Sequence, residues 1–203
     1  AINGKTGALV EILCETDFVA KNDKFRNYLK ELAEKTASAS SQGDLTDEIK
    51  NKEAAALSQM IAVIGENMRI SRVLKWESAS GACAAYLHMG GKIAVMIDAE
   101  GCAGQAVLND VCMHIAAFNP QYIAPENIPA DVIAKEKEIA ASQIGGKPPE
   151  IMEKIVSGKL NKWFAEVCLM KQPWIRDDKL STEKANPGLR VKRFVRWHVG
   201  ENA

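Results

Sequence analysis

Apolar positions at the start of the chain predict a strand followed by a helix. Residues 7–14 are rich in Leu, Val and Ile and follow a turn-forming Asn-Gly pair, which predicts a strand. Residues 23–40 place apolar side chains three and four positions apart, which predicts an amphipathic helix with Asn22 or Asp23 as its N-cap. We therefore expect the strand to pass to the helix through a loop, residues 15–22.

A second helix and a second strand follow. Residues 46–64 carry another apolar stripe, with Thr46 available as the N-cap. Gly65 comes directly after this stripe, at the position where a residue in the left-handed conformation commonly ends a helix. Residues 68–76 alternate between apolar and polar side chains and include β-branched residues, so they predict a strand.

The second half of the chain repeats this order of elements. Residues 92–99 and 190–199 are strand-like, and residues 103–118 have a helical period. The sequence RISRVLKW of residues 69–76 also resembles RVKRFVRW of residues 190–197, since both begin with Arg, end with Trp and share the Arg in between. A match this short can arise by chance, and it also fits a duplicated α+β module.

The lengths of the two halves favour duplication with an insertion. The interval from Val95 to Arg190 is 95 residues and the interval from Val10 to Arg69 is 59, a surplus of 36. This surplus coincides with a separate helical block at residues 130–171. The block is therefore interpreted as an insertion into the second copy.

The inserted block predicts an antiparallel helical hairpin. Its first helix breaks at Gly145-Gly146, and Pro148-Pro149 can begin the second helix. We predict an α+β fold with two related subdomains, each a small antiparallel sheet with packed helices. The predicted boundaries are residues 1–78 for the N-terminal core subdomain, residues 79–203 for the C-terminal core subdomain, and about 131–170 for the hairpin within it.

The composition excludes some classes of function. Lys plus Arg and Asp plus Glu both number 26, so the formal net charge is zero, which argues against an affinity that rests on neutralising nucleic-acid phosphates. No apolar run approaches the roughly 18 residues of a spanning helix, and no signal-peptide pattern opens the sequence. We expect a protein of the bacterial cytoplasm or of an organellar matrix or stroma.

The cysteines and histidines do not form a metal site in the sequence. The cysteines are odd in number, unclustered and mostly flanked by apolar residues, which is typical of reduced core thiols. They are Cys14, Cys83, Cys102, Cys112 and Cys168. The only close Cys/His pair is Cys112 with His114, so we predict no metal ligands.

Cofactor and catalytic motifs are also missing from the sequence. Gly4-Lys5-Thr6 lacks the preceding Gly and the following helix of a phosphate-binding loop. A Cys83/His88 nucleophile pair has no neighbour that would lower the pKa of the thiol. We predict no catalytic residue and no bound cofactor, and hence a binding protein rather than an enzyme.

The loop at residues 16–22, Thr-Asp-Phe-Val-Ala-Lys-Asn, contains the most informative side chain. Phe18 follows a charged residue at the junction of a strand and a helix. Its ring can fold into the core, or it can point outward as a wedge, because loops on a rigid scaffold are where binding residues are commonly placed. The residues alone leave both interpretations open.

This loop resembles the hallmark motif of the elongation factor Ts family, whose members exchange the nucleotide of the translational GTPase elongation factor Tu. Three further segments resemble motifs of that family in the same order: residues 64–70 (IGENMRI), 86–93 (YLHMGGKI) and 172–175 (QPWI). The resemblance covers nearly the whole chain. It implies two α+β subdomains with a helical hairpin inserted in the second, in agreement with the repeat described above.

The resemblance also implies a function and a set of partner-binding residues. The function is promotion of GDP release from elongation factor Tu during translation elongation, by disturbing the magnesium and phosphate site of that GTPase. Asp17 and Phe18 are expected to contact the GTPase near its magnesium, with the Phe ring inserted between side chains there. Ile64, Gly65 and His88 are expected to meet the nucleotide-binding domain, although a structural histidine at a turn also fits His88.

The sequence departs from the family pattern in four places. It corresponds to the family's core region and does not include the small N-terminal domain of ubiquitin-associated type, or the helix that usually follows the last strand. Residues 177–189 differ from the short partner-contacting helix of the family, so that contact is in doubt. Trp174 stands where Phe is more usual.

A competing interpretation is a ribosome- or RNA-associated α+β module. It rests on a basic strand with interleaved aromatic residues, namely Arg190, Lys192, Arg193, Phe194, Arg196 and Trp197. Strand alternation would place Lys192 and Arg196 on the face opposite Arg193, so no continuous basic and aromatic platform forms. We therefore expect a protein partner and no direct contact with nucleic acid.

Overall fold

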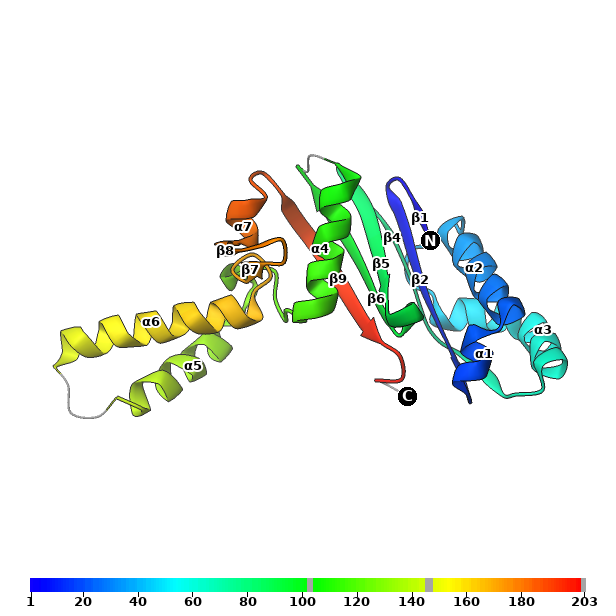
Figure 1. Ribbon diagram of the computed structural model, residues 1–203, viewed down its shortest axis with the longest axis horizontal. Coiled ribbons are helices and arrows are strands. Elements are labelled where there is room, and N and C mark those ends of the chain that lie inside the picture. The colour runs from blue at the N-terminus through cyan, green and yellow to red at the C-terminus, as the bar shows by residue number, and fades with distance from the viewer. Residues whose placement is uncertain (102–103, 145–147, 202–203) are drawn as a thin grey trace. The chain divides into compact units, whose positions relative to one another are not determined.

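The computed structural model describes residues 1–101, 104–144 and 148–201 of the chain (Figure 1). The described chain forms two compact units. The first unit consists of residues 1–116 together with the chain from Arg190 onward, and the second consists of residues 117–189. The elements confirm the predicted α+β class, while the subdomain boundary near residue 78 stays a prediction.

The first unit contains a four-stranded antiparallel sheet with the order β1-β2-β4-β3. Its strands are β1 (Ile2–Asn3), β2 (Thr6–Cys14), β3 (Gly43–Asp44) and β4 (Met68–Glu77). The long β2 and β4 were expected from their apolar patterns. The two-residue strands β1 and β3 were not, because two residues are too few to show alternation.

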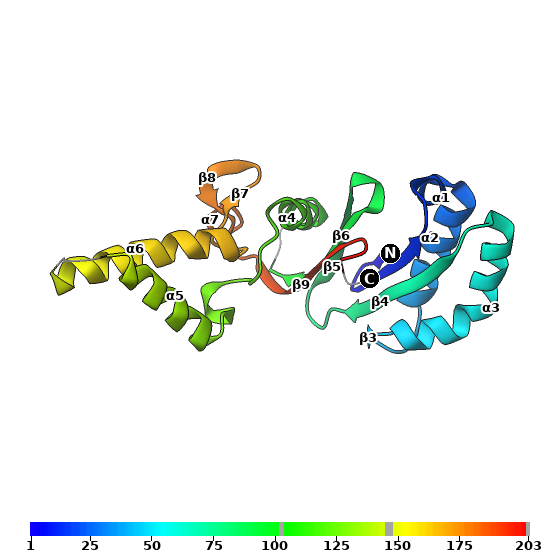
Figure 2. The same ribbon diagram turned by 90° about the horizontal axis from the view of Figure 1, so that it is seen from below.

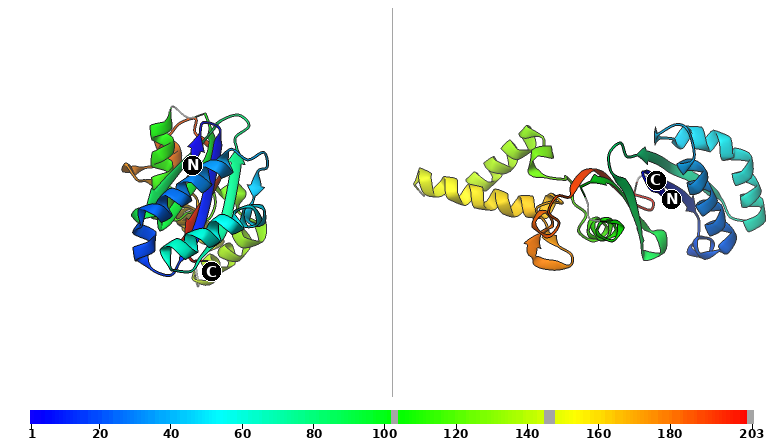
Figure 3. Two further views of the ribbon diagram at one scale, coloured as in Figure 1. Left: turned by 90° about the vertical axis from the view of Figure 1, so that its right-hand side faces the viewer. Right: turned by 90° about the horizontal axis from the view of Figure 1, so that it is seen from above.

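Three helices pack against this sheet: α1 (Asp17–Lys21), α2 (Asp23–Ala37) and α3 (Thr46–Ile64). The buried face of α2 repeats every three or four residues and comprises Phe25, Tyr28, Leu32 and Thr36. These side chains share one core with Ile12, Met68, Ile70 and Val73 of the strands and Ile49 of α3. Figures 2 and 3 show α2 and α3 covering one face of the sheet.

The predicted helix ends are confirmed in two cases and wrong in one. The Asn22 side chain accepts from the Lys24 amide at 2.9 Å, so Asn22 is the N-cap of α2. Gly65 ends α3 with φ 84°, a left-handed conformation that favours glycine. Thr46 does not cap α3, because its hydroxyl accepts instead from the Val73 amide of β4, at 2.9 Å.

The first unit also contains a three-stranded antiparallel sheet with the order β5-β6-β9. Its strands are β5 (Ala82–His88), β6 (Ile93–Glu100) and β9 (Arg190–His198), and a short 3-10 turn, η1 (Met89–Gly91), joins β5 to β6. Helix α4 (Gln105–Phe118) buries Leu108, Val111, Cys112 and Ile115, as its period predicted. The Cys112 thiol lies against the Ile97 backbone of β6, so α4 covers this sheet.

The two sheets contact each other through a small apolar cluster, formed by Leu9, Trp76, Cys83 and Met96. A Cβ atom added to Gly7 would lie 2.6 Å from the Met96 sulfur, which shows how closely β2 approaches β6. The first unit is therefore layered as helices, sheet, sheet and helix (Figure 2).

Strands β4 and β9, each the last strand of its sheet in chain order, make reciprocal contacts. The Arg72 guanidinium of β4 lies 4.6 Å from the centre of the Trp197 ring of β9. The Arg193 guanidinium of β9 lies 4.6 Å from the centre of the Trp76 ring of β4. Arg72 and Arg193 are aligned residues of the predicted repeat, and so are the two Trp residues, so the exchange supports a relationship between the two subdomains.

The second unit contains the helical hairpin and a small two-stranded sheet. Its elements are η2 (Pro125–Asn127), α5 (Ala130–Ser142), α6 (Pro149–Val167), β7 (Pro173–Trp174), β8 (Asp177–Ser181) and α7 (Thr182–Ala185). The base of the hairpin packs around Ile128, Val167 and Cys168. The predicted helix break at Gly145-Gly146 lies outside the described residues.

The cysteine prediction is confirmed in most of the described chain. Cys83, Cys112 and Cys168 are buried free thiols, whereas Cys14 is free and only partly buried. Cys102 lies outside the described residues. In the part of the chain that the structure describes, no helix combines the length and the apolar character needed to cross a membrane.

Candidate partner-binding site

Helix α1 presents Phe18 to solvent. The Phe18 side chain is 79% exposed, the highest value for a large hydrophobic residue in the described chain. Its neighbour Val19 is 5% exposed and belongs to the core under the first sheet. Adjacent residues of a single helical turn point in different directions, so Val19 anchors the turn and Phe18 projects from it. The interpretation in which Phe18 folds into the core is wrong.

Asp17 lies beside Phe18 and is paired with a lysine of the same turn. Its carboxylate accepts from the Lys21 ammonium at 2.8 Å, and both side chains are exposed. This hydrogen bond, with the charge of Lys21 and a smaller contribution from Lys92, holds the pKa of Asp17 below its ordinary value. Asp17 is therefore ionised at neutral pH, and Lys92, directly before β6, lies close enough to act on it.

Thr16 joins α1 to the turn between α3 and β4. The Glu66 carboxylate accepts from the Thr16 amide at 3.1 Å and from the Thr16 hydroxyl at 2.8 Å. The same hydroxyl accepts from the Val19 amide at 3.4 Å, so Thr16 is the N-cap of α1. Two of the segments recognised in the sequence, residues 16–22 and 64–70, are thus bonded to each other.

Ile64 and Gly65 form the end of α3 next to this contact. Ile64 is half-buried against the core of the first sheet, whereas its neighbour Val63 is 62% exposed. A Cβ atom added to Gly65 would meet nothing within 4 Å, so its left-handed backbone, and not space within the chain, is the reason for glycine there. Gly65 leaves its backbone open to a partner.

His88 ends β5 beside the turn into β6. Its Nδ1 lies 3.2 Å from the Tyr86 hydroxyl, and the two rings are 5.9 Å apart. His88 is exposed, and its neighbours Leu87 and Met89 are 63% and 64% exposed. The bond to Tyr86 orients the imidazole without removing it from solvent, so His88 is held in place and also accessible.

These segments share one end of the first unit. The Thr16–Glu66 bonds join α1 to the end of α3, and the electrostatic effect of Lys92 on Asp17 places the β5–β6 turn beside α1. Figure 1 shows α1, the end of α3 and this turn toward its lower edge. We call the exposed large hydrophobic residues of these segments the apolar rim; they are Phe18, Val63, Leu87 and Met89.

The apolar rim indicates a protein-binding surface. Soluble proteins rarely gather exposed apolar side chains in one place unless a partner covers them. Sequence reasoning named Phe18 but missed Val63, Leu87 and Met89. The available signal was their position next to Ile64 and His88, since the strand and helix patterns around them do not distinguish a buried apolar residue from an exposed one.

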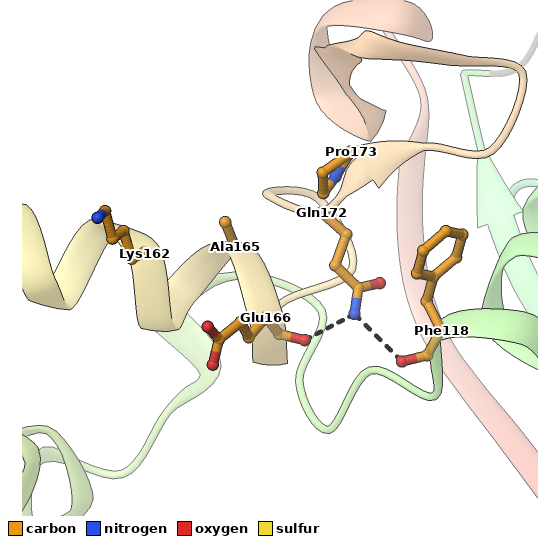
Figure 4. Close-up of a pocket in the computed structure, with 6 residues that line it drawn as sticks. All are labelled: Phe118, Lys162, Ala165, Glu166, Gln172 and Pro173. Atoms are coloured by element: carbon orange, nitrogen blue, oxygen red, sulfur yellow. Dashed lines mark hydrogen bonds between the residues drawn. The ribbon is translucent and has the colours of Figure 1, made fainter.

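The fourth recognised segment has a structural role instead. Gln172 is 2% exposed and donates from its amide to the Glu166 carbonyl at 2.7 Å and to the Phe118 carbonyl at 3.4 Å (Figure 4). Trp174 is 7% exposed. An open hollow of about 490 Å³ lies beside Gln172, between Phe118, Pro173 and the α6 residues Lys162, Ala165 and Glu166. Because the amide of Gln172 is occupied by carbonyls of the chain, it is not offered to a ligand.

The geometry of β9 does not favour the RNA-binding interpretation. Each basic side chain of this strand has a partner within the chain: Arg190 and Lys192 with Glu100, Arg193 with Asp98, and Arg196 with the Ala116 carbonyl. The two carboxylates, Glu100 and Asp98, offset part of the positive charge that phosphate binding would need. Among the described residues, no group of His, Cys, Asp and Glu is arranged to hold a metal ion.

The sequence is similar to proteins from several bacteria. The model of a family described as Elongation factor TS matches residues 15–201. A protein named Elongation factor Ts from Trichlorobacter lovleyi is 38% identical over 228 residues, which cover 98% of this chain and 72% of that protein. Proteins of the same name from Protochlamydia amoebophila and Clostridium botulinum are 38% and 40% identical, over 99% and 97% of this chain and 77% and 71% of theirs. The family match includes every segment that contributes to the apolar rim.

Proposed function

This chain belongs to the elongation factor Ts family and is a nucleotide exchange factor for elongation factor Tu, and we propose that it releases GDP by directing Asp17 and Phe18 at the magnesium and phosphate site of that GTPase. The observation that carries the proposal is the exposure of Phe18, 79%, on a turn whose next residue, Val19, is buried. An exposed aromatic ring on an anchored turn can enter a partner at little entropic cost.

The proposed mechanism is thermodynamic linkage between two ligands of the GTPase. The factor and the nucleotide occupy separate sites, form a transient ternary complex and weaken each other by the same ratio. A 10⁴-fold mutual weakening corresponds to a coupling of about 5.5 kcal/mol. Displacing the magnesium supplies much of this coupling, because a bound divalent ion is among the largest charges in a phosphate site.

Asp17 and Phe18 have different parts in this mechanism. Asp17 is ionised at neutral pH, so it brings a negative charge toward a site that already holds phosphates and competes with them for the cation. Phe18 supplies apolar area that a partner can bury. The Lys21 ammonium restrains the Asp17 carboxylate at 2.8 Å until the partner replaces it.

Other contacts complete the proposed interface. Ile64, Gly65 and His88 meet the nucleotide-binding domain beside the apolar rim. The helical hairpin offers a second contact, motivated by Ile139 of α5 and Ile151 of α6, which are 50% and 46% exposed. Two separate contacts on one partner raise the effective concentration of each for the other.

The proposed role requires no chemistry from this chain. Release of GDP breaks no covalent bond, so the exchange factor needs no catalytic residue, cofactor or metal of its own. Its partner is the GTPase, with no direct contact to nucleic acid. The compartment that fits is the one where elongation factor Tu works, the bacterial cytoplasm or an organellar matrix or stroma.

The test is release of labelled GDP from preloaded elongation factor Tu as this protein is titrated. Linkage predicts a release rate that rises with concentration and then saturates. Phe18→Ala should weaken the complex by about 2 kcal/mol or more, roughly 30-fold, while the melting temperature stays within about a degree of the wild type, because the ring contributes no core.

Phe118→Ala is the matched control. Phe118 is also an exposed Phe, at 46%, and belongs to none of the segments that form the apolar rim. It should leave the titration unchanged. A release rate that stays spontaneous at every concentration of the wild type would refute linkage, and a large loss of melting temperature in Phe18→Ala would refute the assignment of Phe18.

A further inference from the structure

We propose that Glu66 is a positioning residue, which holds α1 in the orientation that Asp17 and Phe18 need to meet the GTPase. This inference rests on the proposed function and concerns a residue that does not itself have to touch the partner. The observation behind it is the set of bonds between Glu66 and Thr16, which spans 50 positions of sequence.

The Glu66 carboxylate holds the start of α1 through its bonds to Thr16. The Glu66 oxygens accept from the Thr16 amide at 3.1 Å and from the Thr16 hydroxyl at 2.8 and 3.0 Å. The hydroxyl then accepts from the Val19 amide at 3.4 Å. Two amides at the start of the helix, those of Thr16 and Val19, are thus satisfied, directly or through the Thr16 hydroxyl, by a single charged acceptor.

Helix α1 needs such support because it is only five residues long. The first turn of a helix costs more entropy than its hydrogen bonds return, so an isolated five-residue helix does not persist in water. Val19 fixes the depth of the turn through the core. The Arg26 side chain of α2 donates to the Ala20 carbonyl at 3.0 Å and holds the end of the turn, while the bonds to Glu66 hold its start.

Glu66 is suited to the role because it stands on a rigid base. Met68 begins β4 and pairs with Cys14, the last residue of β2. Gly65, on the other side of Glu66, ends α3. The carboxylate therefore ties α1 to the end of α3, and the two predicted contact segments move as one body.

Hydrogen exchange of the isolated chain tests the contact without a partner. Glu66→Ala should increase the exchange of the amides of Thr16 and Val19 by about tenfold, as expected for the loss of bonds to a charged acceptor at a partly exposed site. Glu48→Ala is the matched control, since Glu48 is also partly buried and accepts from Lys52 at 2.6 Å on the far part of α3. Equal protection of α1 in Glu66→Ala and the wild type would overturn the proposal.

Nucleotide release tests whether the contact acts through Phe18. Glu66→Ala should raise the concentration needed for half-maximal release by about tenfold, whereas in a Phe18→Ala background the same change should add less than about twofold. Full additivity would mean that Glu66 acts independently of Phe18, which contradicts positioning.

Glu66→Gln separates geometry from charge. A glutamine can accept from the Thr16 amide and donate to the Thr16 hydroxyl, so it keeps the connection without the negative charge. It should restore half-maximal release to within about threefold of the wild type. If Glu66→Gln is as defective as Glu66→Ala, the charge itself matters and the positioning role is wrong.

The titration of the wild type distinguishes a failure of the proposed function from a failure of the role inferred for Glu66. A wild type that fails to accelerate release refutes the function, and hydrogen exchange then still decides whether Glu66 orders α1. An active wild type whose Glu66→Ala variant is equally active refutes the positioning role alone.

Discussion

The two sheets of the first unit are alike where they pack and unlike where they are exposed. In the first sheet Arg72 pairs with Glu11 at 2.5 Å, and in the second Arg193 pairs with Asp98 at 3.1 Å. Each Arg lies over a Trp of the other sheet. A contact that joins the two sheets constrains both β4 and β9, so neither strand is free to change alone.

The two sheets differ in the segment that leads from a strand to the helix that follows it. The link from β2 to α2 is residues 15–22 and contains α1 with its exposed Phe18. The corresponding link from β6 to α4 is residues 101–104, Gly-Cys-Ala-Gly, with no aromatic and no charged residue. The comparison teaches that two similar sheets can carry different binding elements, helix α1 in the first and the β5–β6 turn in the second.

The largest expected effect is a loss of stability on substitution of Trp76, in the contact between the two sheets. Trp76 is 9% exposed and lies in the cluster between the sheets. Trp76→Ala should lower the free energy of unfolding by about 3–5 kcal/mol, measured by urea denaturation, because a large buried side chain is lost. Trp197→Ala should cost less, since Trp197 is only half-buried.

The same pair of variants also has a functional readout. At a temperature where Trp76→Ala is still folded, its maximal rate of GDP release should equal that of the wild type. A stable Trp76→Ala variant with a reduced maximal rate would show that the contact between the sheets takes part in exchange, and the division into packed and binding regions would then be wrong.

A deletion in the helical hairpin is expected to have an effect of intermediate size on binding. Lys159 of α6 donates to the Gln143 side chain at the end of α5, so residues 144–158 can be replaced by a short Gly-Ser linker between positions that already meet. This deletion removes the exposed Ile151 and should weaken binding of the GTPase by about tenfold, measured by titration.

The melting curve of the first unit provides the control for that deletion. Both sheets lie outside the second unit, so their transition should not move. Aggregation of the shortened protein, or a lower transition of the sheets, would mean that the hairpin supports the core and would contradict its assignment as an insertion.

The smallest expected effect is a difference in thiol reactivity between the two regions. Burial raises the pKa of Cys83 to about 11 and of Cys112 to about 12, so these thiols stay protonated at pH 8. Burial also raises the pKa of Cys14, but to a lesser extent, and its side chain is partly accessible beside α1. Peptide mass mapping after brief alkylation should find Cys14 modified before Cys83 and Cys112.

The raised thiol pKa values also give a pH dependence with a definite sign. Between about pH 9 and 11 the unfolded chain loses protons that the folded Cys83 keeps, so the unfolded state binds fewer protons and stability falls as the pH rises. A Cys83→Ala variant should show a shallower decline over the same range. Early alkylation of Cys83 at pH 8 would contradict both expectations.

The sequence predicted the elements that are long enough to show a period. Strand β4 and helices α2 and α4 follow their apolar patterns, and Asn22 and Gly65 mark helix ends through local chemistry that the sequence displays directly. Helix α1 was missed because a turn of five residues has no period to detect.

The pairing of distant residues could not be predicted in the same way. Glu11 pairs with Arg72 but Ile12 pairs with Ile70, so Ser71 is an extra residue that shifts the alternation of β4. The second sheet has the same irregularity at Lys192, the residue aligned with Ser71. Neither bulge is visible in the composition of its own strand, since each depends on the partner strand.

The candidate site was likewise only partly predictable. Family motifs identified Asp17, Phe18, Ile64, Gly65 and His88, and physical patterns alone left Phe18 undecided. The exposure of Phe18 in the structure decided between the two interpretations, because an apolar side chain that lies outside the core is recognised only once the core is known. The role inferred for Glu66 depends on a contact across 50 residues, which no local pattern contains.

The insertion of the second unit between α4 and β9 also sets an order of events during synthesis. The Arg72–Glu11 pair of the first sheet joins residues 61 positions apart, whereas the Arg193–Asp98 pair of the second joins residues 95 positions apart. A chain emerging from the ribosome can close the first sheet while β9 is still untranslated, and β6 must wait for its neighbour until the whole second unit has been made. During that interval β6 presents an unpaired edge, and α4, already synthesised, is available to shield its apolar face.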